Sequence, residues 1–405
     1  MPIWANLPRS ANIGRNSQPM TNRARRDGRL RTQLKLSTAL AALVSAGLMA
    51  VMSPHTGQAR SRLQEAPSLA DAATVAAIYR LDPELAVQWH GMWAYYTDEQ
   101  REIVLGQLQQ ANVHALRMDV SWAMLQPTNA TTYDPWGVSF VDRVVGMISA
   151  HGMTPLITLW LTPGWANANM GDRVPPTNPA DYARVAQWAA NRYAGRVGAW
   201  EVWNEPNSND FFVGASPVVY TNLLKAAYPA FKAGDPKTLV VFGGTQYNDD
   251  AWIAKCYDAG VKGFFDIMST HSYQGMSNQS PLAPDDGTIY RFTHLIAVRN
   301  LMVARGDGAK SIWTGMGYST HVDPPNTPNW NRGVSEVTQA IYLNQAINLI
   351  RQQWPWIGKF GAYVAQDEDV FANFHDRHYG LLRADLSAKP SLTALHDLTM
   401  PAAPA

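Results

Sequence analysis

Eight short apolar stretches, separated by stretches with the apolar spacing of helices, fill the chain from about residue 80 onward. The apolar stretches cover 85–93, 113–120, 154–161, 197–203, 239–243, 265–271, 311–315 and 360–366. The expected helices cover 98–112, 138–151, 178–193, 218–234, 251–259, 289–305 and 334–354. The stretch 154–161 is almost continuously apolar, as expected of a parallel strand that is buried on both faces. This alternation predicts an α/β fold, namely a single (β/α)8 barrel of the TIM type.

The length of the chain, 405 residues, suits one such barrel with additional segments at its ends. Barrels of this kind run to about 250 residues or more as one unit. The sequence has no internal repeat and no linker that would isolate a second domain. We therefore expect a linker over 60–79, the barrel over 80–398 and a disordered tail over 399–405.

Residues 1–59 have the order of features that is typical of an export signal. A basic stretch precedes the apolar run 36–52, and Gly57-Gln58-Ala59 forms a small-residue cleavage pattern. The apolar run is near the lower limit for a membrane span, so an uncleaved signal anchor is the alternative. Cys256 is the only cysteine, and an exported protein without disulfides suits a bacterium. We expect a secreted or envelope protein that touches the membrane only if the signal stays uncleaved.

The charge balance argues against a polyanionic partner. The chain has 33 basic and 32 acidic residues, so we expect it to bind no nucleic acid. No glycine-rich phosphate loop follows the first expected strand, which argues against a nucleotide cofactor. A cation site would have to come from Asp367, Glu368, Asp369 and Asp376, whose spacing is not that of a calcium-binding loop. We expect no cofactor and no metal.

The ends of the expected strands carry the candidate binding residues, because the chemistry of such barrels lies at the carboxyl ends of the strands. Polar and aromatic side chains recur there, namely His90, Trp93, Arg117, Trp160, His271, Tyr273, Tyr318 and Asp367. Flat aromatic faces with a polar rim suit a sugar, so we expect a carbohydrate ligand. The alternative for Arg117 is a buried ion pair and that for His271 is a satisfied core position, whereas His90 and Asp119 suit a structural role equally.

The fourth expected strand runs into the turn Asn204-Glu205-Pro206. Proline ends the strand because it cannot donate to the ladder and fixes its own φ. The turn thus presents a carboxyl and a carboxamide to a ligand, with Trp203 as an apolar wall beside them. This arrangement suits a general acid. The alternative is an ordinary surface turn.

Four sequence segments together resemble those of the retaining glycosidases of clan A, which are (β/α)8 barrels, and most of all the bacterial glycosidases of families 39 and 5. The resemblance covers roughly 80–398 and rests on segments 116–122, 200–207, 268–273 and 379–383. It implies a glycoside hydrolase acting on an oligosaccharide or polysaccharide. It also implies that Glu205 is the acid/base, that Asn204 contacts the sugar 2-hydroxyl and that Arg117 supports the nucleophile. We expect a monomer.

The seventh strand departs from the family's pattern. That pattern ends in Thr-Glu-x-Gly, with Glu as the nucleophile, whereas this chain has Thr314-Gly315-Met316-Gly317. Only Glu336 and Glu368 follow Glu205 in the chain, so no nearby glutamate can replace the nucleophile by a shift of register. A retaining mechanism needs a second carboxyl about 5–5.5 Å from the first. Gly315 therefore marks a nucleophile position without a nucleophile.

Three explanations stay open at this point. In the first, the glycine replaces the glutamate of a working enzyme. In the second, the chain is a natural, catalytically silent glycan-binding protein of the envelope. The third explanation is an inverting or altered mechanism in which Asp367, Glu368 or Asp323 acts with Glu205. Inverting enzymes hold their two carboxyls about 6.5–9.5 Å apart, which neighbouring strand ends can provide.

Overall fold

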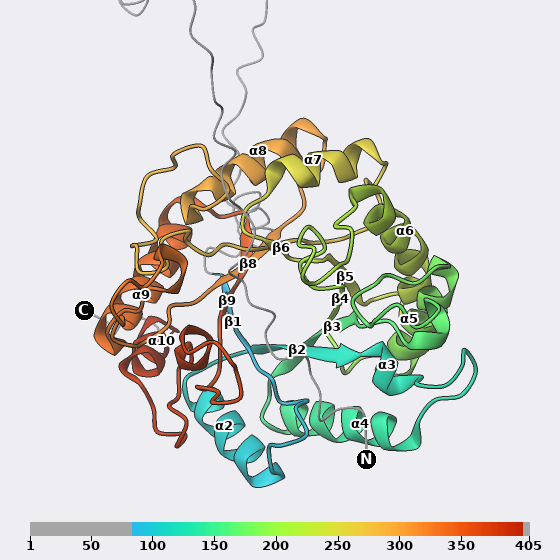
Figure 1. Cartoon of the computed structure of the whole chain (residues 1–405), viewed down its shortest axis with the longest axis horizontal. Coiled ribbons are helices and arrows are strands. Elements are labelled where there is room, and N and C mark those ends of the chain that lie inside the picture. The colour runs from blue at the N-terminus through green and yellow to red at the C-terminus, as the bar shows by residue number, and fades with distance from the viewer. Residues whose placement is uncertain (1–82, 400–405) are drawn as a thin grey trace, which may run out of the picture. The chain divides into compact units, whose positions relative to one another are not determined.

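The computed structural model describes residues 83–399, and a parallel sheet curved into a barrel is at their centre (Figure 1). The strand order is β5-β4-β3-β2-β1-β9-β8-β7-β6. The strands are β1 (Glu84–Gln88), β2 (Ala115–Ser121), β3 (Thr154–Trp160), β4 (Ala199–Val202), β5 (Leu239–Phe242), β6 (Thr245–Gln246), β7 (Met268–His271), β8 (Ile312–Met316) and β9 (Ile357–Ala362). The export signal and linker predicted over 1–59 and 60–79, and the tail over 400–405, lie outside the described residues.

The two ends of the strand order are two halves of one strand. β5 and β6 are separated only by Gly243-Gly244. Val241 of β5 forms a parallel bridge with Ile267, which directly precedes β7, and the amide of Phe242 donates to the carbonyl oxygen of Ile267 at 2.9 Å. The first and last strands of the sheet therefore meet, which confirms the predicted (β/α)8 barrel.

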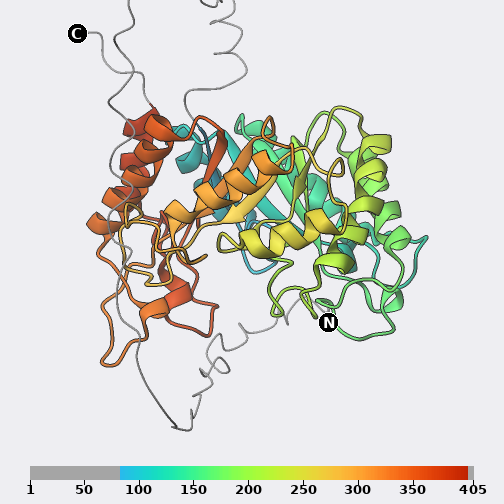
Figure 2. The ribbon, with the colours of Figure 1, turned by 90° about the horizontal axis from the view of Figure 1, so that it is seen from above.

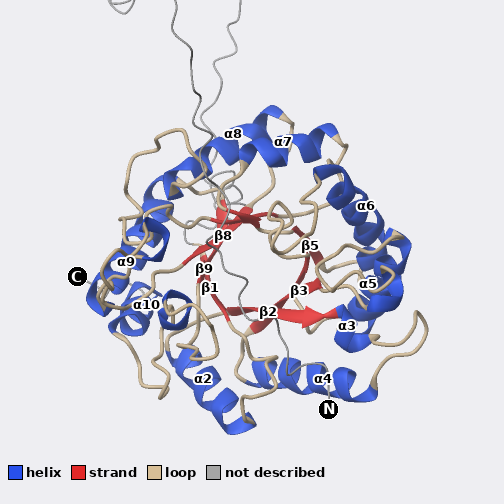
Figure 3. Cartoon of the chain, viewed as in Figure 1, coloured by secondary structure: helices blue, strands red, loops and turns tan. Residues whose placement is uncertain are grey.

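Helices surround the sheet on its outer face (Figure 3). They are α2 (Asp98–Gln110), α3 (Trp122–Leu125), α4 (Pro135–Ala150), α5 (Pro179–Arg192), α6 (Pro217–Gly234), α7 (Asp250–Asp258), α8 (Leu295–Ala304), α9 (Glu336–Gln353) and α10 (Pro390–Thr399). In Figure 2, α7 and α8 lie in front of the strands. Asp134, Asn178 and Ser216 cap α4, α5 and α6, each of which begins with a proline. No helix within residues 83–399 is long and apolar enough to cross a membrane.

The structure differs from the sequence prediction near the carboxyl end of the barrel. The eighth strand was expected over 360–366, but β9 covers Ile357–Ala362. Tyr363, directly after it, still donates to the carbonyl of Met316 on β8, and the residues that follow bond to residues 379–383, the closing segment of the barrel. The amide of Val364 donates to the carbonyl of Tyr379, and that of Leu382 donates to Ala365. The final helix, α10, was not predicted, and Thr399 ends this helix instead of beginning a tail.

A small apolar cluster fills the amino-terminal part of the barrel interior. It contains Leu156, Ala199, Val241, Ile267 and Trp313. Side chains alternate along a strand, so the residues two positions further on face the interior as well. Thr158, Glu201 and Gly315 are these residues on β3, β4 and β8. They form the next layer toward the carboxyl ends of the strands.

Candidate functional site

Glu205 lies on a strained turn directly after β4. Trp203 and Glu205 both have left-handed backbone conformations, with φ of 70° and 44°. Such conformations cost energy for residues other than glycine and cluster at functional sites. The buried indole of Trp203 holds the turn by donating to the carbonyl of Phe211 at 2.8 Å, and the amide of Glu205 donates to Gly244 at 3.0 Å. The turn keeps the carboxyl of Glu205 largely buried, with the whole residue 8% exposed.

His271 lies between Glu205 and β8, the strand that contains Gly315. Its Nδ1 lies 2.8 Å from Oε1 of Glu205. His271 ends β7 and stands in register with Gly315 on β8. Gly244 permits this close packing, because a Cβ there would lie 2.5 Å from the imidazole Nε2. Glu205 therefore contacts the side chain of the residue that is paired with Gly315.

Gly315 occupies a place where β8 and β9 approach closely. A Cβ at this position would lie 2.9 Å from the carbonyl oxygen of Gly361, and the next nearest atoms are 3.7 Å away. Gly361 is the residue paired with Gly315 across the two strands. A Cβ at Gly361 would meet nothing closer than 3.7 Å. A side chain at position 315 thus needs a shift of one backbone carbonyl and is otherwise unobstructed near the chain.

Arg117 uses all of its side-chain nitrogens within the barrel. Its Nε and Nη2 contact Oε2 of Glu201 at 2.7 and 2.6 Å. Its Nη1 donates to Oε1 of Gln88 at 2.6 Å, and its Nη2 donates to Oδ1 of Asn204 at 2.8 Å. The buried ion-pair role considered for Arg117 is therefore present. The contact with Asn204 also orients the carboxamide next to Glu205.

Glu201, which the sequence reasoning did not single out, is the fully buried partner of Arg117. It also accepts from Oγ1 of Thr158 at 2.5 Å and from the amide of Gly244 at 2.9 Å. Burial opposes ionisation, but the charge of Arg117 and these hydrogen bonds hold the pKa of Glu201 below its usual value. A charged residue within an otherwise apolar strand, two positions after Ala199, was the available signal.

His90 and Trp93 belong to an aromatic and acidic group at the carboxyl end of β1. Nδ1 of His90 lies 2.7 Å from Oε2 of Glu368, and the hydroxyl of Tyr96 donates to Oε1 of Glu368 at 3.0 Å. The rings of His90 and Trp93 are parallel within 9°, with centroids 4.2 Å apart. His90 is thus a buried, paired histidine, and Trp93 stays partly exposed beside it.

Trp160 and Tyr273 are partly exposed aromatic side chains at the ends of β3 and β7. Trp160 lies edge to face against Trp203, with ring centroids 6.4 Å apart. Its buried indole Nε1 has no hydrogen-bond partner among the described residues. Tyr273 makes edge contacts with Tyr363 and Tyr379 at 6.1 and 6.3 Å. The partly exposed ring, and not the buried donor, makes Trp160 a candidate stacking face for a ligand.

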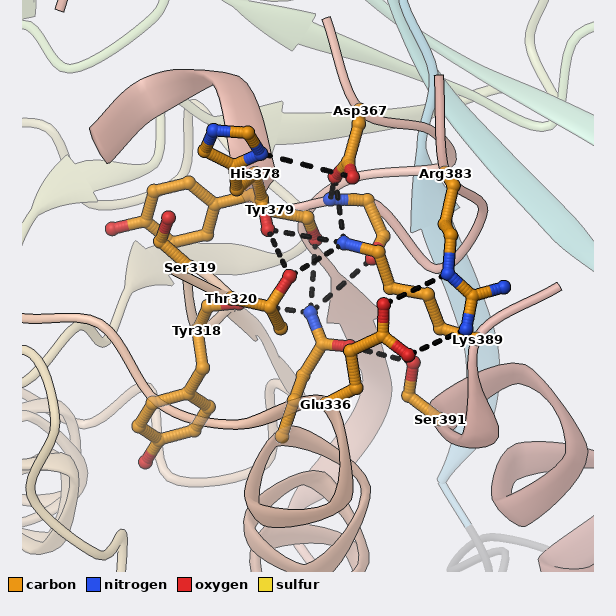
Figure 4. Close-up of polar contacts among 12 residues, drawn as sticks. Tyr318, Ser319, Thr320, Glu336, Asp367, His378, Tyr379, Arg383, Lys389 and Ser391 are labelled. Carbon is orange, nitrogen blue, oxygen red and sulfur yellow. Dashed lines mark hydrogen bonds and ion pairs between the residues drawn. The ribbon is translucent and has the colours of Figure 1, made fainter. Parts of the chain in front are cut away.

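Two of the predicted binding residues have structural contacts instead. Tyr318 is 1% exposed, and its hydroxyl donates to the carbonyl of Gln279 at 3.1 Å. Asp367 accepts from Nζ of Lys389 at 2.7 Å and from the amide of Gly380 at 2.8 Å (Figure 4). Asp367 follows β9 by five positions because the strand ends earlier than predicted. These contacts assign both side chains to packing and not to substrate binding.

Figure 4 shows that Asp367 belongs to a network that joins the closing segment to α9 and α10. Lys389 also donates to Oγ1 of Thr320 at 2.7 Å, and its side chain is 1% exposed. Glu336 forms an outer ion pair with Arg383 at 2.6 Å. Burial raises the pKa of Asp367 and lowers that of Lys389, so each depends on the other to stay charged.

Replacing Lys389 by methionine should therefore destabilise the protein by about 3–5 kcal/mol, because the carboxylate of Asp367 would remain buried without its cation. Urea unfolding followed by circular dichroism measures this loss. Glu336→Gln is the control and should cost much less, because it removes only the more exposed pair of the same network. Equal losses of stability would contradict the structural role given to the buried pair of Asp367 and Lys389.

The carboxyl groups considered as replacements for the nucleophile are engaged elsewhere. Asp323 accepts from the amide of Gly333 at 2.6 Å, and both Asp367 and Glu368 have the partners described above. Burial raises the pKa of Asp376 to about 6. Within residues 83–399, no group of three or more histidine, cysteine or acidic side chains is arranged to hold a metal ion. None of these contacts leaves a carboxylate free to act with Glu205.

Comparison with known proteins agrees with this geometry. Residues 81–304 match the family described as Cellulase (glycosyl hydrolase family 5), and the match ends before β8. A β-xylosidase of Caldicellulosiruptor saccharolyticus is 30% identical over 149 residues, which are 33% of this chain and 30% of that protein.

Two solved structures are similar over most of the barrel. A family 39 glycoside hydrolase of Bacteroides cellulosilyticus WH2 has a TM-score of 0.62 and 23% identity, covering 78% of this chain and 64% of that one. A monomeric β-xylosidase of Caulobacter crescentus CB15 has a TM-score of 0.58 and 18% identity, covering 78% and 67%. The chain thus spans less than two thirds of the Caldicellulosiruptor β-xylosidase and of the family 39 hydrolase, and the structural likeness concerns the fold.

Proposed function

Because this chain belongs to the cellulase family, glycosyl hydrolase family 5, we propose that the carboxyl end of its barrel binds a β-linked oligosaccharide or polysaccharide, with Glu205 as the acid/base. The observation that carries the proposal is the strained turn that holds Glu205 against His271 at 2.8 Å. As general acid, Glu205 gives its proton to the glycosidic oxygen while the bond to the anomeric carbon breaks. His271 fixes the direction of the carboxyl group.

Asn204 is the second group that contacts the sugar in this proposal. Its Oδ1 already accepts from Arg117 at 2.8 Å, so its amide nitrogen is left to donate. A donor next to the acid/base suits a ring hydroxyl of the cleaved sugar. Arg117 thereby acts on the substrate through Asn204 and does not depend on a nucleophile at position 315 for its own hydrogen bonds.

The nucleophile position is vacant in the proposed mechanism. Glycine at 315 cannot form a glycosyl-enzyme intermediate, and Asp323, Asp367 and Glu368 each have partners of their own. The surroundings tolerate this glycine, because the donors of Arg117 are satisfied by Glu201, Gln88 and Asn204. We expect the protein to bind its glycan and to hydrolyse it extremely slowly.

One observation favours the second candidate, a catalytically silent glycan-binding protein. The carbonyl of Gly361 lies where a Cβ at Gly315 would come within 2.9 Å. Real Cβ atoms essentially never lie so close to a backbone oxygen, so the two strands suit a glycine at this position. In this alternative, Trp93, Trp160 and Tyr273 hold the sugar and no bond is broken.

The remaining parts of the proposal rest on the sequence and on similarity. The basic and apolar pattern over 1–59 supports export to the envelope or medium. The similarity to a monomeric β-xylosidase supports a monomer. The family supports a carbohydrate as the partner.

Affinity electrophoresis in native gels tests the binding that both candidates share. Soluble xylan or hydroxyethylcellulose in the gel should retard the protein, and Trp160→Ala should weaken this retardation about tenfold, as for loss of an aromatic anchor. Trp356→Ala is the matched control, because Trp356 directly precedes β9 at the opposite end of the barrel. A protein retarded by neither polysaccharide would contradict the proposed function.

A further inference from the structure

We propose that Glu368 is a positioning residue, which acts through His90 to fix Trp93 as a wall for stacking a sugar ring. This inference rests on the proposed function, because it assigns a specificity-determining contact to the same binding site. It assigns a role in binding to Glu368, which the proposed hydrolysis does not use.

Glu368 is placed to join two loops and not to react. The residue is 3% exposed, and each of its oxygens has one partner. Oε2 contacts His90 at 2.7 Å, and Oε1 accepts from Tyr96 at 3.0 Å. His90 and Tyr96 lie between β1 and α2, whereas Glu368 lies after β9, and β1 pairs with β9 in the sheet. Glu368 therefore holds these adjacent loops together.

The orientation of Trp93 follows from that of His90. The imidazole stacks on the indole within 9° of parallel, with centroids 4.2 Å apart. Phe371, three residues after Glu368, makes edge contacts with both rings, at 6.2 Å to His90 and 5.5 Å to Trp93. The indole is thus supported by one side chain that Glu368 orients and by a second from the same loop.

Protonation of His90 would strengthen this support. Burial alone would lower the pKa of His90, but the charge of Glu368 and its hydrogen bond raise it above the usual value. Asp119 acts in the same direction and Arg117 against it. A protonated imidazole on the face of an indole adds an attraction between cation and ring. A neutral residue at 368 would weaken both the ion pair and this attraction.

A fixed indole is useful to a sugar-binding site because the protein loses little side-chain freedom when the ligand binds. Trp93 stays partly exposed and offers an apolar face to the C–H groups of a pyranose ring. Glu368→Gln keeps the size of the side chain but removes the charge that orients His90. Affinity for the polysaccharide should then fall although Glu368 need not touch it.

A double-mutant cycle tests whether Glu368 acts on binding through Trp93. The proteins are the unmodified chain, Glu368→Gln, Trp93→Ala and the double variant, each measured by affinity electrophoresis with soluble xylan and with hydroxyethylcellulose. We expect Glu368→Gln to weaken binding about tenfold and to cause no further loss in the Trp93→Ala background. Glu336→Gln, which removes a distant acidic side chain, is the matched control and should bind normally. The indole resonance of Trp93 in a ¹⁵N-tryptophan spectrum should move on Glu368→Gln.

The outcomes separate this inference from the proposed function. Retardation of the unmodified protein together with unchanged binding by Glu368→Gln, or with additive losses in the cycle, would overturn the positioning role and leave the function intact. Failure of both polysaccharides to retard the unmodified protein would overturn both. If Glu368→Gln does not fold, His90→Gln replaces it in the same cycle and should show the same coupling, because it removes the partner through which Glu368 acts on Trp93.

Discussion

Gly315→Glu should give the protein clear hydrolytic activity on aryl β-xylosides or aryl β-glucosides, on which the unmodified chain should be nearly inert. A gain of about 10³-fold or more is expected, since loss of a nucleophile in another hydrolase costs on the order of 10⁶ in kcat. The carboxylate would enter the interior layer beside His271, whose imidazole already contacts Glu205. Release of the aryl alcohol measures the rate.

Two controls separate the nucleophile from other effects of the substitution. Gly315→Gln has the same size without the charge and should stay inert. Gly361→Glu puts a carboxylate on the neighbouring strand, where a Cβ meets no atom within 3.7 Å, and tests whether any interior carboxylate suffices. Since Gly315→Glu must displace the carbonyl of Gly361, the gain should stay below that of an enzyme built around a glutamate.

Azide or formate should rescue part of the activity of the unmodified protein on an activated aryl glycoside. The anion attacks the anomeric carbon, the bond to the aryl oxygen breaks, and the aryloxide leaves with the electron pair. With azide the product is a glycosyl azide of inverted configuration. Fast hydrolysis by the unmodified protein without any added anion, abolished by Glu368→Gln, would instead support a relocated carboxylate. Glycan binding without hydrolysis by Gly315→Glu would support the silent binding protein.

The sequence was sufficient for the barrel because each strand and helix has its own local pattern. It was not sufficient for the end of the eighth strand. The apolar run continues through Val364 and Ala365, but these residues bond to Tyr379 and Leu382 in the closing segment. The hydrogen-bond partners of these residues depend on how segments distant in the sequence pack together, and the local spacing of apolar residues does not indicate this packing. For the same reason Asp367, read as the end of a strand, proved to be the partner of Lys389.

The turn of Glu205 was predictable because proline and the preceding strand fix where the carboxyl appears. Glu201 was missed because its one signal, a charged residue in a short apolar strand, indicates neither its partner nor its role. Its role depends on Arg117, 84 positions away in the chain, which the barrel brings to 2.6 Å. Tyr318 was assigned to the wrong environment for a related reason. It lies two residues beyond β8, where the chain turns its side chain into the core.

In the Gly315→Glu protein, the further change Glu205→Gln should reduce the hydrolysis of a xylo- or cello-oligosaccharide by about 10²–10⁴-fold. The sugar leaving group needs a proton as the glycosidic bond breaks, and glutamine has none to give. An aryl glycoside with a strongly acidic leaving alcohol should lose much less in the bond-breaking step, because its aryloxide is stable without protonation. The ratio of kcat/KM values on the two substrates is therefore the measurement.

The ratio distinguishes a proton donor from a residue that only shapes the site. Asn204→Ala removes the neighbouring carboxamide, which contacts Arg117 and not the leaving group, and should reduce both rates by similar factors. Glu205→Gln should reduce them unequally. If Gly315→Glu itself proves inactive, the same comparison can be made on the azide-rescued reaction of the unmodified protein. Equal losses of kcat/KM on the oligosaccharide and the activated aryl glycoside would mean that Glu205 is not the general acid. The proton donor would then have to be a residue outside this turn.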